Sequence, residues 1–218
     1  MIVVIQCAAR KRPGAGCLSS ASGKHVIFVA DPKTAPADGN HIYTRPDDPC
    51  DAGTSWRDLL LKYNEQACDN PLGLYPAYRL YGNPVYERLV DRFGLQKAYI
   101  LSAGWGLIRA DFLTPYYDIT FSASAERYKR RRKTHRYYDF RMLSDHADEE
   151  ILFFGGKDYL PLFCSLTAAI KTGRTVFYNS VRAPQATGCV LKRFETSTRT
   201  NWHYECANAF LDGTIDPT

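Results

Sequence analysis

The sequence predicts an α/β fold in which a mostly parallel central sheet of about four strands is flanked by helices, in three layers. Short β-branched or aromatic runs recur along the chain, stretches with helical spacing lie between them, and several runs end at glycine or at small polar residues. This alternation is typical of three-layer α/β sheets. With 218 residues, 45% of them hydrophobic, the chain is long enough to bury one full core, so we expect a single domain over residues 1–218.

The N-terminal part is expected to hold two strands and a long loop. Residues 2–7 form a β-branched run that stops at a basic loop containing Gly and Pro, and residues 25–30 form a second short apolar run. Residues 31–55 contain four prolines and almost no periodicity. We therefore predict a loop insertion at 31–55, and loops of this length in compact domains often serve function.

Two helices and a further strand are expected next. The apolar spacing of residues 56–67 predicts a helix that Ser55 caps, and residues 84–93 predict a second helix with Pro84 in its first turn. Residues 98–103 form an apolar run of the kind that makes a buried strand.

The C-terminal half continues the alternation. A helix that begins near Ser122 or Ser124 is expected to carry a basic run toward Leu143. The remaining expected elements are strands at 151–154 and 175–178, helices at 159–171 and 201–211, and a hairpin at 189–194. If the strands are parallel, their carboxyl ends meet at one edge of the sheet, where open α/β sheets bind ligands. The segments expected there are Gln6 and Cys7 with Arg10 and Lys11, residues 104–118, residues 155–158, and Asn179 with Ser180.

The most informative motif is the strand at 98–103 together with the polar and aromatic stretch that follows it. That stretch contains, in order, Gly106, Leu107, Ile108, Asp111, Pro115 and Tyr116. It resembles the signature of the YaaA-like proteins, in which a strand is followed by such a Gly, Leu/Val and Ile/Leu group, an Asp and a Pro-Tyr pair. Residues 81–86 are similar to the Asn-Gly-Asp-Val-Tyr segment of that family, although Pro84 stands at the position of its Asp.

The resemblance covers residues 81–121 and extends weakly to the Cys-x-x-x-Lys start at 7–11 and to the turn at 156–159. It implies an α/β fold like that of the uracil-DNA glycosylases, contact with DNA, and a role in protection against oxidative damage. Because some relatives look like base-excision enzymes, it also implies removal of a base.

Asp111 and Asp118 are the candidate catalytic carboxylates. Cleavage of an N-glycosidic bond passes through an oxocarbenium-like sugar, and a carboxylate beneath the sugar stabilises that charge or activates the attacking water. The alternative is that both are turn residues whose oxygens accept hydrogen bonds from nearby amides.

Other polar and aromatic side chains are candidates for binding the substrate: Gln6, Lys11, Asn83, Arg109, Tyr116, Tyr117, Asn179, Ser180 and His203. Amides pair with the donors and acceptors of bases, tyrosine rings stack on a flipped base, and cations contact phosphate. The structural alternatives are a surface lysine at Lys11, a helix cap at Asn83, an ion pair between Arg109 and Asp111, and a core histidine at His203.

Positive charge is concentrated in residues 127–136, of which seven are Lys or Arg and none is acidic, while the whole chain carries a net charge of +5. The seven are Arg127, Lys129, Arg130, Arg131, Arg132, Lys133 and Arg136. Tyrosines interleave with them, a pattern that favours nucleic acid, and we predict that this basic run contacts the DNA backbone. The alternative is a solvated charged face.

Other function classes lack their signals. The seven cysteines show no CxxC pair and no zinc-finger spacing with His, and the P-loop and dinucleotide fingerprints are absent. No apolar segment approaches the roughly 18 residues of a membrane span, and no signal peptide is recognisable. We expect a reduced, cytoplasmic protein without metal, cofactor, membrane contact or obligate protein partner.

Three hypotheses follow. The first is a DNA glycosylase that flips a modified base into a pocket at the strand ends and leaves an abasic site. The loop at 31–55 would form one wall, and a hypermodified phage base would make the protein an antiviral defence factor. The second is a DNA-binding stress-protection protein without catalysis. The third is a nucleoside or nucleotide hydrolase.

Overall fold

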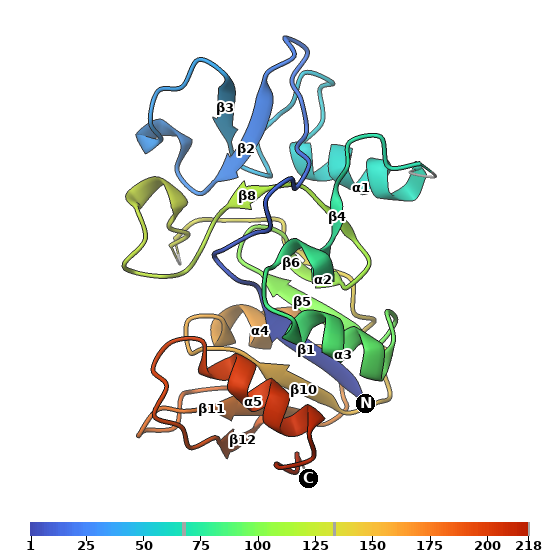
Figure 1. The fold of residues 1–218 in the computed structure, drawn as a ribbon, viewed down its shortest axis with the longest axis vertical. Coiled ribbons are helices and arrows are strands. Elements are labelled where there is room, and N and C mark those ends of the chain that lie inside the picture. Colours follow the sequence, from blue (N-terminus) through green and yellow to red (C-terminus); the bar gives the residue numbers. More distant parts are fainter. Residues whose placement is uncertain (67–68, 133, 218) are drawn as a thin grey trace.

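The computed structural model describes residues 1–66, 69–132 and 134–217 of the chain. Its largest element is a seven-stranded sheet, which lies in the lower part of Figure 1. In spatial order its strands are β12 (Val190–Arg193), β11 (Arg174–Tyr178), β10 (Ile151–Phe154), β1 (Ile2–Gln6), β5 (Ala98–Ser102), β6 (Gly106–Arg109) and β9 (Phe140–Arg141). The prediction of a mostly parallel α/β sheet is confirmed, but the sheet has seven strands rather than about four.

The order of the strands identifies one edge of this sheet as the place for a ligand. Strands β5, β1, β10, β11 and β12 are parallel neighbours, so the sheet has the doubly wound order 2-1-3-4-5. From β1 the chain first builds one side of the sheet and then returns to build the other. The carboxyl ends of β1 and β10 therefore flank the switch point, where such sheets leave a crevice.

Helices cover both faces of the sheet. Helices α3 (Val85–Phe93) and α5 (Trp202–Leu211) contact each other and the strands on one face, whereas α4 (Leu160–Leu166) packs on the other. Two neighbours on β10 show the layering: Phe153 stacks on Phe163 of α4, and Phe154 contacts Phe210 of α5, with ring centroids 4.4 and 5.6 Å apart. Successive side chains of a strand point to opposite faces, so the sheet is the middle of three layers.

A smaller parallel sheet forms the upper part of Figure 1 together with α1 (Trp56–Gln66). Its strands are β3 (His41–Thr44), β2 (His25–Val29) and β8 (Tyr117–Asp118). The antiparallel pair of β4 (Tyr75–Pro76) and β7 (Leu113–Thr114), with the short helix α2 (Ala77–Leu80), lies between the two sheets. Residues 31–55, expected to be a loop, include the 3-10 turn η1 (Pro32–Thr34) and all of β3.

The prediction that a helix carries the basic run is wrong. The only helical element there, within the described residues, is the 3-10 turn η2 (Arg127–Lys129). Cations at helical spacing repel one another, and the backbone instead pairs with the segment after β8: Thr120 donates to the Lys129 carbonyl and accepts from the Arg131 amide, at 2.9 and 2.8 Å.

Two other expectations also need correction. The helix expected over 159–171 ends at Leu166, where Thr167 begins a turn, and its first residue is Leu160. The segment expected as a hairpin at 189–194 is β12, which pairs in parallel with β11. None of the helices in the described parts of the chain combines the length and the apolar character of a membrane span.

Candidate functional site

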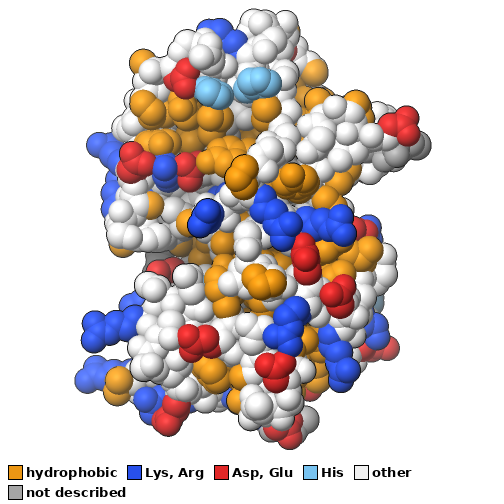
Figure 2. All heavy atoms as spheres, viewed as in Figure 1, with side chains coloured by type: hydrophobic (Ala, Val, Ile, Leu, Met, Phe, Trp, Pro, Cys, Tyr) orange, Lys and Arg blue, Asp and Glu red, His pale blue; other side chains and the backbone are white. Residues whose placement is uncertain are grey.

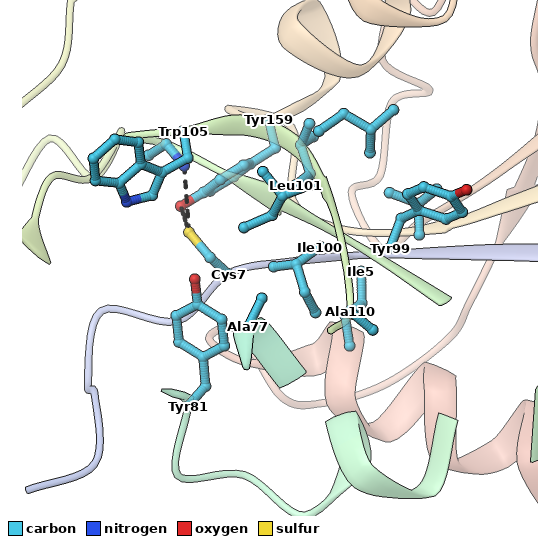
Figure 3. Packing of buried hydrophobic residues seen from close by; sticks show 14 of the residues in the cluster. Ile5, Cys7, Ala77, Tyr81, Tyr99, Ile100, Leu101, Trp105, Ala110 and Tyr159 are labelled. Carbon is cyan, nitrogen blue, oxygen red and sulfur yellow. Dashed lines mark hydrogen bonds between the residues drawn. The ribbon is translucent and has the colours of Figure 1, made fainter. Parts of the chain in front are cut away.

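The switch point is closed by side chains from three strand ends. The Gly156 amide donates to Oε1 of Gln6 at 2.6 Å, which ties the end of β10 to the end of β1. The thiol of Cys7 accepts from the Ala103 amide at 3.4 Å and contacts the hydroxyl of Tyr159 at 3.2 Å (Figure 3). The carboxyl ends of β1, β5 and β10 therefore converge, as predicted. Gln6, a candidate for substrate binding, uses its side-chain oxygen to bind the backbone after β10.

The turn after β5 is built on Ser102. Its Oγ accepts from the amides of Gly104 and Trp105 at 3.2 and 3.1 Å and donates to the hydroxyl of Tyr117 at 2.9 Å. The Tyr117 hydroxyl also lies 2.8 Å from that of Tyr81. Burial raises the pKa of both tyrosines well above the ordinary value, so both stay neutral. Tyr117, a candidate for base stacking, is fully buried in this network.

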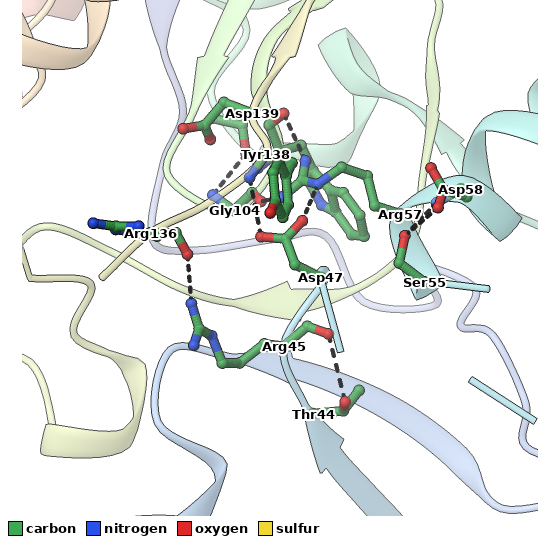
Figure 4. Close-up of polar contacts among 12 residues, drawn as sticks. Thr44, Arg45, Asp47, Ser55, Arg57, Asp58, Gly104, Arg136, Tyr138 and Asp139 are labelled. Atoms are coloured by element: carbon green, nitrogen blue, oxygen red, sulfur yellow. Dashed lines mark hydrogen bonds and ion pairs between the residues drawn. The ribbon is translucent and has the colours of Figure 1, made fainter. Parts of the chain in front are cut away.

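Two buried arginines, Arg57 and Arg131, hold the same turn through its backbone carbonyls. Figure 4 shows Arg57 between Gly104 and Asp47. Arg57 donates to the carbonyls of residues 104 and 105, both at 3.0 Å, and pairs with Asp47. Arg131 donates to the carbonyl of residue 103 at 2.9 Å and forms a two-bond ion pair with Asp139, at 2.8 and 2.6 Å. Arg131 was predicted to contact DNA, but its guanidinium binds a backbone carbonyl and Asp139 within the protein.

Several predicted site residues do come together at the end of β8. Lys11 is only 8% exposed, its Nζ lies 4.0 Å from the centroid of the Tyr117 ring, and burial lowers its pKa. Asp118 forms an ion pair with Lys129 at 2.9 Å, and the hydrogen bonds of Lys129 to Glu126 and then to Asp118 raise the pKa of Lys129. Tyr116 is half-buried, and burial followed by the charge of Asp118 raises its pKa.

Asp111 and Arg109 do not join this group. Strand β6 runs antiparallel to β5, so Arg109 lies opposite Tyr99, near the start of β5 and far from its carboxyl end. Arg109 forms an ion pair with Asp111 at 2.5 Å, as the structural alternative anticipated. The expectation that all of residues 104–118 reach the switch point is wrong because the chain reverses direction at Gly104. Oδ1 of Asn83 accepts from the Val85 amide at 2.9 Å, at the start of α3, as expected of a helix cap.

Three more candidates lie near the end of β11 and in α5. Asn179 donates to the Thr198 carbonyl at 3.3 Å, and Ser180 donates to the Arg182 carbonyl at 2.7 Å. His203 is 3% exposed, and burial lowers its pKa to about 4. The Asn179 amide and the Ser180 hydroxyl therefore both have backbone partners within the protein, and His203 is a neutral side chain of the interior.

A pocket of about 1180 Å³ lies between residues 121–139 and the beginning of α4. Basic side chains line it: Arg130, Arg131, Arg132, His135, Arg136 and Lys157. Lys157 comes after β10 and the two glycines that follow it, so the pocket adjoins the switch-point edge of the sheet. Figure 2 shows Lys and Arg side chains, with some Asp and Glu among them, across the middle of the face that it draws.

The cations of this pocket differ in what they contact. Within the described ranges, no carboxylate lies at ion-pair distance from Arg132, Arg136 or Lys157, and all three are exposed. Arg130 donates to the carbonyl of Ala123 at 3.0 Å. Burial, followed by the charges of nearby arginines, lowers the pKa of His135, so this side chain is neutral at pH 7.

The rest of the predicted basic run is divided. Arg127 pairs with Asp31 at 3.7 Å, and Lys129 is bound to Asp118 and Glu126. Lys133 lies outside the described residues. Of the seven predicted DNA contacts, Arg132 and Arg136 are thus the exposed cations of the pocket without a carboxylate partner among the described residues.

Aromatic and acidic side chains complete the lining. The Tyr137 ring lies under the guanidinium of Arg131, 3.9 Å from its centroid, and burial raises the pKa of Tyr137 to about 12. Tyr138 is 85% exposed. Asp139 is used by Arg131, whereas Asp158 has no ion-pair partner in the described parts of the chain. Lys157, Asp158 and Tyr138 were not predicted as site residues, although residues 155–158 were placed at this edge.

No group of three or more His, Cys, Asp or Glu side chains among the described residues is arranged to hold a metal ion. Comparisons with protein-family models, with curated proteins and with solved structures found no match to this chain.

Proposed function

We propose that this chain binds DNA and that the pocket between residues 121–139 and α4 holds the phosphate backbone. The observation that carries the proposal is the set of three exposed cations on that pocket, Arg132, Arg136 and Lys157, which have no carboxylate partner within the described residues. Interleaved tyrosines beside cations suit nucleic acid better than a small anion. The resemblance of the sequence to YaaA-like proteins supports the same choice.

The partner-free cations are the ones that matter for binding. An arginine that already holds a carboxylate gains little from a phosphate, because one ion pair would have to replace another. Arg131 and Lys129 are in that state, with Asp139 and Asp118. A free cation neutralises a phosphate and releases condensed counterions, which drives association with DNA. We therefore expect Arg132, Arg136 and Lys157 to dominate the affinity.

The test is the affinity of single variants for a short DNA duplex. Arg132→Gln, Arg136→Gln and Lys157→Gln are each expected to weaken binding several-fold at about 50 mM salt, where each phosphate contact counts most. Arg92→Gln on α3 is the matched control, because Arg92 is also exposed but lies outside the pocket. Equal losses in Arg92→Gln and in the three pocket variants would show that only the total charge matters.

Excision of a base is a second candidate function, favoured by Asp158. This carboxylate lines the same pocket as the free cations and has no ion-pair partner in the described parts of the chain. A carboxylate beside a sugar in a cationic pocket can stabilise the oxocarbenium charge of glycosidic cleavage. Asp118 remains a candidate in its ion pair with Lys129, whereas Asp111 lies near the opposite edge of the sheet.

Abasic-site formation tests this second function. The panel includes plain DNA, DNA with uracil or oxidised bases, and phage DNA with hydroxymethylated or glucosylated pyrimidines, each read by alkali cleavage. We expect the wild-type chain to cause breaks in one modified DNA only. Asp158→Asn should abolish these breaks, whereas Asp111→Asn should cleave as the wild type does. Loss of cleavage in Asp118→Asn alone would assign the chemistry to the end of β8. If all DNA stays intact while binding persists, the chain is a DNA-binding protein without this activity.

A further inference from the structure

Tyr138 presents its ring to solvent at the margin of the pocket. The side chain is 85% exposed and lines the pocket together with Arg132, Arg136 and Lys157. Few large apolar side chains of the described residues are this exposed, because burying an aromatic ring is strongly favourable. An exposed ring on a pocket wall is thus a ready surface for a flat, apolar ligand face.

The backbone beneath this ring is fixed on both sides. The Tyr138 amide donates to Oδ2 of Asp47 at 3.2 Å, and Asp47 is held by the buried Arg57 (Figure 4). The next residue, Asp139, is held by two bonds from Arg131. Because these bonds already order the main chain at Tyr138, binding of a ligand to the ring costs little further backbone entropy.

The ligand chemistry follows from the neighbours of the ring. Exposed cations line the same pocket: Arg136, which is two residues before Tyr138, and Lys157. A nucleobase offers a flat face to stack on tyrosine, and its flanking phosphates offer charges to the cations. In continuous duplex DNA the bases stack on one another and expose only their edges in the grooves. A ring can therefore stack on a base only where that base is unpaired.

We propose that Tyr138 stacks on an unpaired base, so that the preferred substrate is DNA with a single-stranded or extruded nucleotide rather than continuous duplex. This inference rests on the proposed DNA binding and specifies its substrate class. Stacking on an aromatic side chain changes affinity by about tenfold or more per base. Tyr138 is then the residue that distinguishes the two forms of DNA, whereas the cations bind both.

The experiment compares three labelled DNAs of one sequence: single strand, perfect duplex, and duplex with one unpaired nucleotide. For the wild-type chain we expect about tenfold tighter binding of the two DNAs that contain an unpaired base. Tyr138→Ala should reduce their binding to the level of the duplex, and Tyr138→Phe, which keeps the ring, should retain the preference. Val181→Ala is the matched control, because Val181 is 89% exposed and lies outside the pocket.

Two readouts separate this inference from the DNA binding on which it rests. The salt dependence of binding should be the same in Tyr138→Ala and in the wild type, because no phosphate contact is removed. A 2-aminopurine at the unpaired position should lose fluorescence on binding to the wild type but not to Tyr138→Ala. Salt-dependent binding with equal affinity for all three DNAs would overturn the role of Tyr138 and leave DNA binding intact. Failure to bind any DNA would overturn both.

Discussion

His203 should make the folding stability of this chain depend on pH. The side chain is 3% exposed, and its Nε2 is buried without a hydrogen-bond partner in the described residues. Burial lowers its pKa to about 4, against an ordinary value of 6.5. The unfolded chain therefore binds this proton at a higher pH than the folded chain does. The stability that neutral His203 contributes is complete above pH 6.5 and is lost progressively as the pH falls toward 4.

The size of the effect follows from the two pKa values. A full shift of this size corresponds to roughly 3 kcal/mol, because one pKa unit is worth about 1.4 kcal/mol. Between pH 7 and pH 5, protonation of the unfolded chain alone should remove about 2 kcal/mol of the free energy of unfolding. Urea unfolding at both pH values measures this quantity in the wild type and in His203→Gln, whose side chain stays neutral throughout.

The difference between the two proteins isolates the histidine. Carboxylates that titrate in the same range contribute equally to both and cancel. The wild type should lose about 2 kcal/mol more than His203→Gln between pH 7 and pH 5. Equal losses in the two proteins would refute the reasoning, as would a titration of the His203 ring protons that gives a pKa of 6.5 or above in the folded state.

Three further perturbations test the site. Arg57→Met should lower the free energy of unfolding by about 3–5 kcal/mol in urea titrations, because it leaves Asp47 buried without its partner and the turn carbonyls without donors. Gly106→Ala should cost more than about 1 kcal/mol in the same assay, since its φ is +91° and a Cβ would lie 2.6 Å from the Phe140 carbonyl oxygen. DNA affinity should rise as the pH falls below the lowered pKa of His135, because protonation adds a cation to the pocket, and His135→Gln should reduce this rise.

The strands that sequence reasoning found are those with continuous apolar runs. Strands β1, β5 and β10 are buried on both faces, so nearly every residue in them is apolar and the runs are visible without any tertiary information. In β11 the run is shorter, because Arg174 and Thr175 precede the three residues Val-Phe-Tyr. The missed strands lack that signal. Strand β12 is half-exposed and reads Val-Leu-Lys-Arg, and β9 has only two residues. Their assignment depends on neighbours distant in sequence.

The site was harder to predict because strand direction and ion pairing decide it. Nothing local to Asp111 shows that β6 runs antiparallel to β5, yet that direction moves the carboxylate away from the switch point. Arg131 reads as one cation among seven, but its pairing with Asp139 places it in the interior. Lys11, a few residues after β1, lies over the Tyr117 ring next to Asp118, but Asp118 ends β8 of the smaller sheet, a strand that the sequence did not reveal.

The salt dependence of DNA binding tests the central claim most directly. Three phosphate contacts predict that log affinity falls against log salt with a slope of about −2.7, or roughly 40-fold between 50 and 200 mM. The triple variant of Arg132, Arg136 and Lys157 to Gln should lose most of that slope, whereas Arg92→Gln combined with Lys62→Gln, two exposed cations outside the pocket, should keep it. An unchanged slope in the triple variant would contradict the claim that this pocket holds the DNA backbone.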